Sequence, residues 1–183
     1  MNDKRQILID TALSLFYAKG VNSIGINEIL KVSGIAKKTL YNQFESKEAL
    51  VLAALEQRNS IFLRWLKTVL NEAKTDRELI ERLFNALTAW FSNSVHELGD
   101  FRGCFFINTS AEFSDPNSEI SLYCQFHKQQ VREVIGKHLS AANEELLDAI
   151  CILKEGAITT AYVENNLFTP QKCIKILSKH ISS

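Results

Sequence analysis

The spacing of apolar residues is the feature that most limits how this chain can fold. Apolar side chains recur at steps of three and four residues, which is the period of an amphipathic α-helix, and they rarely alternate as in a strand. Only 7 glycines and 2 prolines interrupt the 183 residues, so long helices meet few breaks. The pattern predicts an all-α protein of about nine helices. A small N-terminal head would be joined by a long helix to a C-terminal helical bundle.

Residues that start or stop helices set the expected boundaries. Ser46 suits an N-cap, and Thr75 and Glu78 have the spacing of a capping box. Asp115 and Thr169 each place a capping side chain directly before a proline, which suits the first turn of a helix. We therefore expect helices over residues 3–19, 26–33, 37–43, 47–73, 76–97, 103–113, 117–139, 144–165 and 170–181.

The two short helices are joined by a turn that contains Gly34. Glycine can adopt the left-handed conformation that swings one helix across the next, so this segment suits a helix-turn-helix, whose second helix lies in the DNA major groove. Ile35, Leu40 and Phe44 can face inward. The polar residues left outside are Lys37, Lys38, Thr39, Tyr41, Asn42 and Gln43. An ordinary solvated helical hairpin is the alternative, because it too leaves polar residues outside.

A set of residues in the first 50 stands at a recognisable spacing: Ile7, Ala12, Leu15, Phe16, Gly20, Ile29, Gly34, Thr39, Leu40, Tyr41, Phe44 and Ser46 to Leu50. In this set, residues 7–50 resemble the DNA-binding domain of the TetR family. The resemblance implies that Thr39, Tyr41 and Lys47 contact the DNA backbone. It also implies that Lys37, Lys38 and Asn42 face the bases or their flanking phosphates.

The sequence departs from the family's usual residues at Gly25, Leu30, Ala36 and Lys38. Without a hydroxyl at position 25 or 36, the caps of both short helices must come from elsewhere. The segment Arg102-Gly103-Cys104-Phe105-Phe106-Ile107-Asn108 is similar to one in a TetR-like subgroup with an Arg-Gly-Cys-x-Phe-x-x-Asn-like segment in its sensing domain. This similarity supports the architecture without identifying a ligand.

Charge is distributed unevenly along a chain whose net charge is zero. Residues 1–47 hold seven basic and four acidic side chains, which gives +3 and leaves −3 for the remainder. Positive charge therefore lies where a surface that binds phosphates needs it. We expect a helix-turn-helix DNA-binding domain over residues 1–47 and a ligand-sensing and dimerisation domain over residues 48–183.

Aromatic residues are concentrated after the head, where 13 of the 17 lie. Such enrichment suits an apolar pocket for a small molecule, and it equally suits a plain aromatic core. The TetR resemblance implies a small-molecule effector, whose identity the sequence does not reveal. Our candidates for lining its pocket are Phe62, Trp65, Phe84, Trp90, Phe105, Asn108 and Phe126.

The last two helices carry an apolar stripe at helical spacing. Its residues are Leu146, Ile150, Leu153, Ala157 and Ala161, continued by Ile174, Leu177 and Ile181. In a monomer these residues would be core, but the resemblance implies that the last two helices of two chains pair in a homodimer. A two-fold dimer reads an approximately palindromic DNA site.

The function expected is sequence-specific binding of double-stranded DNA, most simply by a repressor that a small-molecule effector releases from a palindromic operator. The alternatives are a helical adaptor, and a small all-helical enzyme without DNA specificity. No P-loop, HExxH or nucleophile-elbow motif is present, so we expect no enzyme activity.

The four cysteines and four histidines show no metal-ligand spacing, so we expect neither a metal nor another cofactor. Cys104 falls in the first turn of an expected helix, which would suit a redox or electrophile sensor, but a buried inert cysteine is the favoured interpretation. The chain shows no secretory leader and no run long enough to span a membrane, so we expect a cytoplasmic protein.

Overall fold

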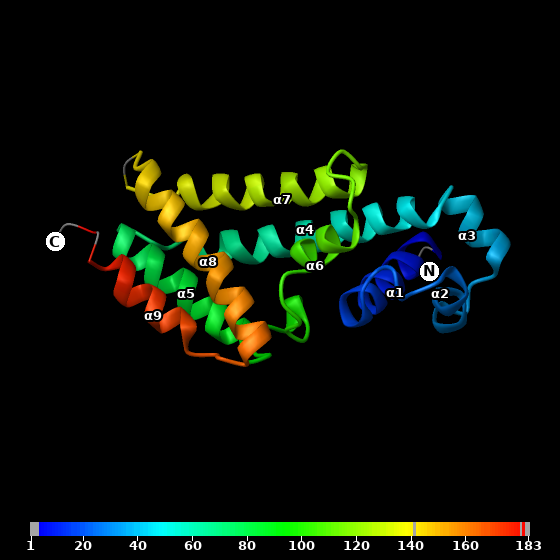
Figure 1. Ribbon diagram of the computed structural model, residues 1–183, viewed down its shortest axis with the longest axis horizontal. Coiled ribbons are helices and arrows are strands. Elements are labelled where there is room, and N and C mark those ends of the chain that lie inside the picture. The colour runs from blue at the N-terminus through cyan, green and yellow to red at the C-terminus, as the bar shows by residue number, and fades with distance from the viewer. Residues whose placement is uncertain (1–3, 141, 180, 182–183) are drawn as a thin grey trace. The chain divides into compact units, whose positions relative to one another are not determined.

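The computed structural model describes residues 4–140, 142–179 and 181. These residues form α1 (Lys4–Lys19), α2 (Ile26–Ser33), α3 (Lys37–Gln43), α4 (Lys47–Leu70), α5 (Asp76–Phe91), α6 (Phe105–Glu112), α7 (Glu119–Gly136), α8 (Glu144–Glu164) and α9 (Thr169–Leu177), with a short 3₁₀ helix η1 (His96–Leu98) (Figure 1). The prediction of an all-α chain of nine helices is confirmed within the described residues. In that part of the chain, no helix is both long and apolar enough to cross a lipid bilayer.

Most predicted helices lie within a few residues of their observed bounds, and α2 and α3 match theirs. The fifth helix was predicted to continue to residue 97 but ends at Phe91. Its end is set by Asn93, which adopts a positive φ of 58°, while the Ser94 amide bonds back to the Ala89 carbonyl. The last helix ends at Leu177, before the predicted 181. The predicted start at residue 3 lies outside the described residues.

Two of the predicted N-terminal caps are present. Ser46 Oγ accepts the Ala49 amide at 3.1 Å, and Thr75 Oγ1 accepts the Glu78 amide at 3.2 Å. The return bond of the capping box is displaced by one residue, because the Glu78 carboxylate accepts the Lys74 amide at 2.8 Å. Both helices thus begin where their capping residues predict.

The two caps predicted before prolines are wrong. Asp115 Oδ1 accepts a backbone amide inside its own turn, and Ser118 caps α7 instead by accepting the Ser121 amide at 3.2 Å. Thr169 is the first residue of α9, and its hydroxyl donates to the Asn166 carbonyl at 3.1 Å. In both places a local turn uses the side chain that the sequence offered as a cap.

The chain packs as two compact units. The first contains residues up to Ser60 together with Phe105–His127, and the second contains Ile61–Cys104 together with the residues from Lys128 onward. The first unit therefore joins the predicted DNA-binding head to α6. The predicted functional division at residue 47 stays a prediction.

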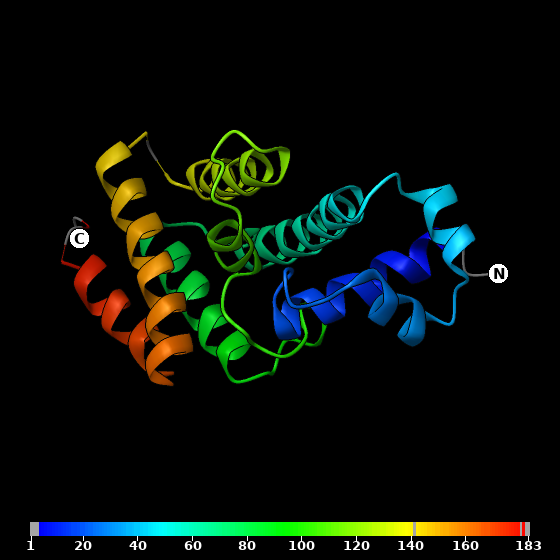
Figure 2. The same ribbon diagram turned by 45° about the vertical axis from the view of Figure 1, so that its right-hand side comes forward.

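In the first unit, α2 and α3 both pack on α1. The buried side chains that these three helices share are Leu8, Ala12, Phe16, Ile29 and Leu40, with Phe44 directly after α3. In the second unit, α5, α8 and α9 pack against one another and lie side by side in both ribbon views (Figures 1 and 2). Their core includes Leu83, Phe84, Leu87, Ile150, Ala157, Ile158, Cys173 and Leu177.

Gly34 makes the turn between α2 and α3 and should not tolerate a side chain. Its φ is +69°, and its amide donates to the Leu30 carbonyl at 3.0 Å. Because this left-handed conformation strains any residue with a Cβ, Gly34→Ala is expected to lower the free energy of unfolding by about 1–2 kcal/mol. Urea unfolding followed by circular dichroism measures the change.

The matched control for this turn is Gly25→Ala. Gly25 has an ordinary φ of −88°, and a Cβ built there meets nothing within 4 Å. The free energy of unfolding of this variant should therefore change by less than ~1 kcal/mol. If both variants were as stable as the wild type, the strain argument for Gly34 would be wrong.

Candidate nucleic-acid interface

The inner side of α3 holds this short helix on the head. Leu40 is fully buried and Phe44 is 4% exposed, and α3 packs on α1. The Arg5 guanidinium lies 4.9 Å from the centre of the Phe44 ring, a cation–π contact that ties α1 to the end of α3. The inward positions predicted for Leu40 and Phe44 are therefore observed, and Ile35 is half-buried.

The outer side of α3 is polar and open. Lys37, Lys38, Asn42 and Gln43 are exposed, and Tyr41 is 47% exposed. Thr39 is half-buried. Within the described part of the chain, no hydrogen bond or ion pair engages these six side chains. Both ribbon views show α3 at the edge of the head (Figures 1 and 2).

Neither short helix has a side-chain cap at its start. Gly25 precedes α2 and Ala36 precedes α3, and at both positions the structure shows no capping hydrogen bond from a side chain. Packing of its inner side must therefore keep α3 helical, because seven residues are too few for a stable isolated helix.

Lys47 is engaged within the head. Its ammonium donates to the Val21 carbonyl at 2.7 Å and lies 5.9 Å from the centre of the Phe16 ring. It therefore ties the start of α4 to the turn after α1. The predicted contact of Lys47 with the DNA backbone stays a prediction.

Glu112, at the end of α6, contacts the same turn. Its carboxylate accepts the Val21 amide at 2.8 Å and the Asn22 amide at 2.6 Å, and its backbone carbonyl accepts the Asn22 side-chain amide at 3.1 Å. Glu112 carried no predicted role, because about 90 residues separate it from its partners and no local pattern marks such a contact.

Comparison with known proteins identifies the head. The family model described as "Bacterial regulatory proteins, tetR family" matches residues 8–54, which include most of α1, all of α2 and α3, and the start of α4. The match spans about a quarter of the chain, so it shows that the head is similar to the DNA-binding domain of the TetR family. The likeness of the head is to the DNA-binding part of helix-turn-helix transcriptional regulators.

Relatives extend the likeness beyond the TetR-family head. The chain is 29% identical over 169 residues to the uncharacterised regulator YuxN of Bacillus subtilis, a match that covers 90% of this chain and 55% of YuxN. It is 25% identical over 122 residues to the Escherichia coli repressor NemR, covering 65% of this chain and 58% of NemR. The chain thus spans little more than half the length of these two curated relatives.

Solved structures show the same fold as this chain. The reduced form of E. coli NemR has a TM-score of 0.80 at 19% identity and covers 99% of this chain and 98% of its own. A TetR-family transcriptional regulator from Streptomyces coelicolor has a TM-score of 0.78 at 22% identity, with 96% of both chains covered. At these identities the likeness concerns the fold.

The predicted pocket residues of the second unit form an aromatic core. The Phe62 ring centre lies 5.2 Å from that of Trp65 and 5.7 Å from that of Trp90. Phe84 is fully buried. These four side chains come from α4 and α5 and are buried, which is what the plain-core alternative predicted. Whether they also touch an effector stays a prediction.

The other predicted pocket residues belong to the first unit. Phe105 is buried and makes an edge contact with Tyr17 at 5.8 Å between ring centres. Asn108 is half-buried, and Phe126 is 46% exposed on α7. Beside them the buried His127 ring stacks on Phe106 at 3.5 Å. No local sequence pattern signalled this stacked pair.

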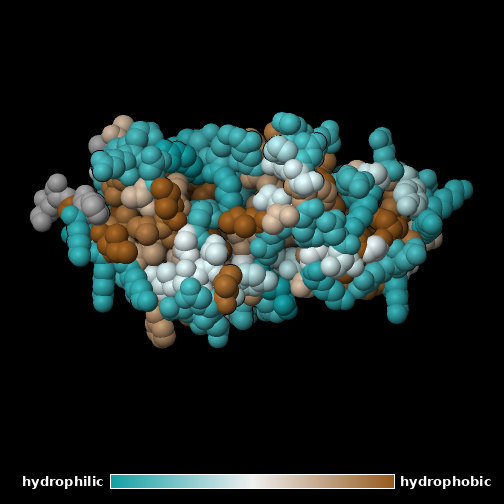
Figure 3. Space-filling view, viewed as in Figure 1, coloured by the Kyte–Doolittle hydropathy of each residue, from teal (hydrophilic) through white to brown (hydrophobic). Residues whose placement is uncertain are grey.

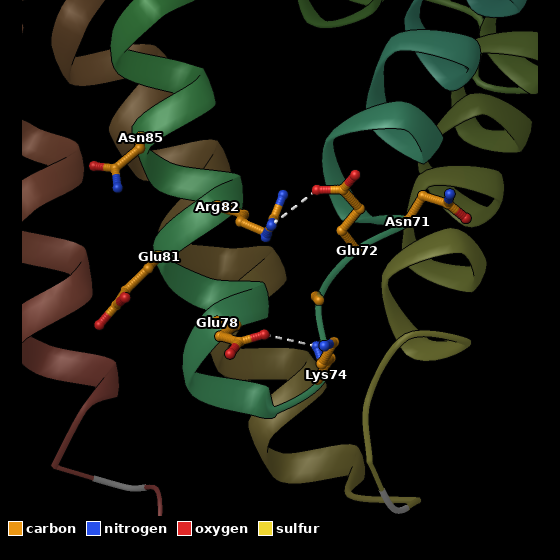
Figure 4. Close-up of a pocket in the computed structure, with 8 residues that line it drawn as sticks. Asn71, Glu72, Lys74, Glu78, Glu81, Arg82 and Asn85 are labelled. Carbon is orange, nitrogen blue, oxygen red and sulfur yellow. Dashed lines mark hydrogen bonds and ion pairs between the residues drawn. The ribbon is translucent and has the colours of Figure 1, made fainter.

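Three surface hollows of the second unit are lined by other residues. The largest, of about 900 Å³, lies between the end of α4 and α5 (Figure 4). Its lining is mostly polar: Asn71, Glu72, Ala73, Lys74, Glu78, Glu81, Arg82 and Asn85. Glu72 and Arg82 form an ion pair across it at 3.1 Å. Two smaller hollows, of about 360 and 350 Å³, adjoin α7.

The stripe predicted for the dimer interface faces the core of its own chain. Leu146, Ile150, Ala157, Ala161 and Leu177 are all at most 5% exposed, and Leu153, Ile174 and Ile181 are half-buried. The burial of these five residues agrees with the core alternative, and the predicted pairing of the last two helices in a homodimer stays a prediction.

A partly buried charge cluster lies next to Cys104 in the second unit. The Lys128 ammonium lies 3.2 Å from Cys104 Sγ and 2.8 Å from the Glu155 carboxylate. The same carboxylate also pairs with Lys154, whose side chain is only 3% exposed. Cys104 is 8% exposed, as the inert-cysteine interpretation expects. The pairing of Cys104 with Lys128 has no signal in the sequence.

Proposed function

We propose that this chain is a TetR-family repressor that binds a palindromic operator as a homodimer and leaves it when a small-molecule effector binds. The observation that carries the DNA-binding part is the open polar side of α3, in a head that matches the family model. The name of NemR describes a repressor, which supports repression here.

The side chains on α3 suit two kinds of contact with DNA. Lys37 and Lys38 bring positive charge to phosphate oxygens or to the guanine edge, while Asn42 and Gln43 can pair bidentately with adenine. Tyr41 presents a phenol that can donate to phosphate. All five are exposed on one short helix, so α3 can be read as the recognition helix.

Removing two of these charges tests the interface. Lys37→Ala/Lys38→Ala should weaken DNA binding by roughly 10-fold or more. The slope of log K plotted against log salt concentration should also become shallower, by about 2 for each head that binds. The measurement uses the duplex that the purified wild type selects from a random pool, and we expect that selected sequence to be a palindrome.

The matched control is Lys67→Ala/Lys74→Ala, which removes two exposed lysines from the second unit. Its affinity and salt dependence should match those of the wild type. If the α3 variant also matched the wild type, α3 would not be the recognition helix. If the wild type selected no sequence at all, sequence-specific binding would be wrong.

For the homodimer we propose the side of α8 that faces away from the core. Ile152 is 70% exposed and Val163 is 74% exposed, and with Gly156 and Thr159 they fall on one helical stripe. Figure 3 shows hydrophobic side chains gathered over α8 and α9, where Phe168 and Ile176 are also exposed. Exposed apolar groups in such a stripe suit a surface that another chain covers.

Gly156 supports the choice of this stripe. It lies inside α8 on the exposed side, and a Cβ built there meets nothing within 4 Å. A glycine inside an exposed helix costs about 1 kcal/mol relative to alanine, and nothing in its own chain requires it. A second helix that approaches closely would require it. We propose that Ile152, Gly156, Thr159 and Val163 replace the buried stripe as the dimer contact.

Release by an effector follows from linkage. A ligand can lower operator affinity only if it binds the DNA-free conformation more tightly, and operator then lowers ligand affinity by the same factor. A titration of operator affinity against candidate ligands tests this part of the proposal. Ligands that bind without changing operator affinity would remove the sensing role and leave DNA binding intact.

A further inference from the structure

We infer that Glu112 is the positioning residue that makes α6 part of the DNA-binding head. It holds the turn between α1 and α2 in the place that DNA binding requires. The inference rests on the proposed function, because it concerns how the recognition helix is positioned. Glu112 itself touches no DNA in this proposal and acts through the turn.

The carboxylate of Glu112 satisfies two consecutive backbone amides, those of Val21 and Asn22, at 2.8 and 2.6 Å. Hydrogen bonds to an ionised acceptor are the stronger kind, and neither amide lies within a helix. Asn22 adds a third bond from its side chain to the Glu112 carbonyl at 3.1 Å. Three bonds thus join the last residue of α6 to two residues of the turn.

Gly20 provides independent evidence that the carboxylate is closely fitted. Its φ is +87°, and a Cβ built there would lie 3.1 Å from Glu112 Oε1. A side chain at position 20 would therefore be strained by its backbone and would press on the carboxylate. The turn and the carboxylate are closely complementary.

Lys47 holds the other face of the same residue. Its ammonium donates to the Val21 carbonyl at 2.7 Å, so Val21 is bonded through its amide to Glu112 and through its carbonyl to Lys47. Val21 is itself fully buried. The turn is thereby fixed between α6 and the start of α4, both within the first unit.

The turn matters for DNA because α2 begins four residues after Asn22, and α3 follows α2 through Gly34. If the turn is released, the head spends less time in the conformation that fits the groove. The apparent dissociation constant rises as the competent fraction falls. Movement of α6 would therefore also shift α3, through the hydrogen bonds between Glu112 and the turn.

The first measurement needs no DNA. Amide hydrogen exchange by NMR on the full chain should show Val21 and Asn22 protected in the wild type. Glu112→Ala should speed their exchange by about 10- to 100-fold, since each loses a bond to a charged acceptor. Glu112→Gln keeps one acceptor oxygen and should fall between the two. Amides inside α1 should remain as protected as before.

The second measurement compares affinity for the selected duplex with affinity for a scrambled one. Glu112→Ala should lose at least ~10-fold for the selected duplex and little for the scrambled one, because nonspecific binding needs no fixed head. The control Glu28→Gln removes the same charge from the same unit, and among the described residues its carboxylate pairs with Lys19 at 2.8 Å. It should keep the wild-type ratio of the two affinities.

The outcomes separate this inference from the proposed function. Unchanged exchange at Val21 and Asn22 in Glu112→Ala would overturn the contact itself. Faster exchange with an unchanged ratio of affinities would overturn the positioning role. A wild type that selects no duplex would instead overturn the proposed function, and the exchange data would still test the contact.

Discussion

Placing charge on the exposed stripe of α8 is expected to convert the protein to monomers and to weaken operator binding by ~100-fold or more. The variant is Ile152→Glu/Val163→Glu. A dimer would have to bury four added carboxylates against one another, whereas in the monomer both positions are solvated, at 70% and 74% exposure. The affinity falls because one head then binds without the second head tethered beside it.

Sedimentation velocity measures the mass, and titration of the selected duplex measures the affinity. The control is Leu122→Glu, an exposed apolar residue on α7 in the first unit. It adds charge to an apolar surface position without touching α8, and should leave both quantities at wild-type values. A variant that remained dimeric would place the interface away from the α8 stripe.

Glu155→Gln is expected to lower the free energy of unfolding by about 3–5 kcal/mol at pH 7. The Lys154 side chain is 3% exposed and pairs with this carboxylate, which also lies 2.8 Å from the Lys128 ammonium. Removing the carboxylate leaves a buried ammonium without its partner, and the desolvation of that charge is then uncompensated. Urea unfolding gives the value.

The same cluster predicts how stability responds to acid. Burial works to raise the pKa of Glu155, but the Lys154 and Lys128 ammonium groups outweigh it and hold that pKa below its ordinary value. A lowered folded-state pKa contributes stability above the unfolded-state value of ~4.3, and the contribution is lost as pH falls through the folded-state pKa. The difference in free energy of unfolding between the wild type and Glu155→Gln should therefore become smaller below about pH 4.

Glu145→Gln is the control for both measurements, since Glu145 is exposed on the same helix. Its stability should stay within ~1 kcal/mol of the wild type at pH 7, the size of a surface interaction with the helix dipole. If Glu155→Gln were equally mild, the cluster would be solvated and the buried-charge argument would fail.

Local signals in the sequence were sufficient for the head. The bounds of α2 and α3, the left-handed Gly34 and the burial of Leu40 follow from residues within one turn of each other. The Ser46 cap was also predicted and found. These features depend on backbone preferences and short-range periodicity, which a single sequence carries.

Local sequence patterns could not predict which side of α8 faces the core. The helix carries apolar residues on both sides, with Ile150 and Ala157 on one and Ile152 and Val163 on the other. Periodicity selects the more apolar stripe but does not say whether the chain's own core or a partner covers it. The stripe chosen for a partner was the one that α5 and α9 cover within the chain.

Contacts between distant segments were also missed. Glu112 with Val21, His127 with Asn59, and Lys128 with Cys104 join residues that lie 91, 68 and 24 positions apart. The local sequence around either residue does not predict its partner, because each contact forms only when the helices pack together. Such pairs must be found in the structure.

The absence of side-chain caps on α2 and α3 has a consequence for the order in which the protein loses structure. A seven-residue helix without a cap is ordered only while α1 supports it, so mild denaturation should melt the recognition helix as soon as α1 loosens. Operator binding should then vanish on gentle warming, before circular dichroism reports the global loss of helix.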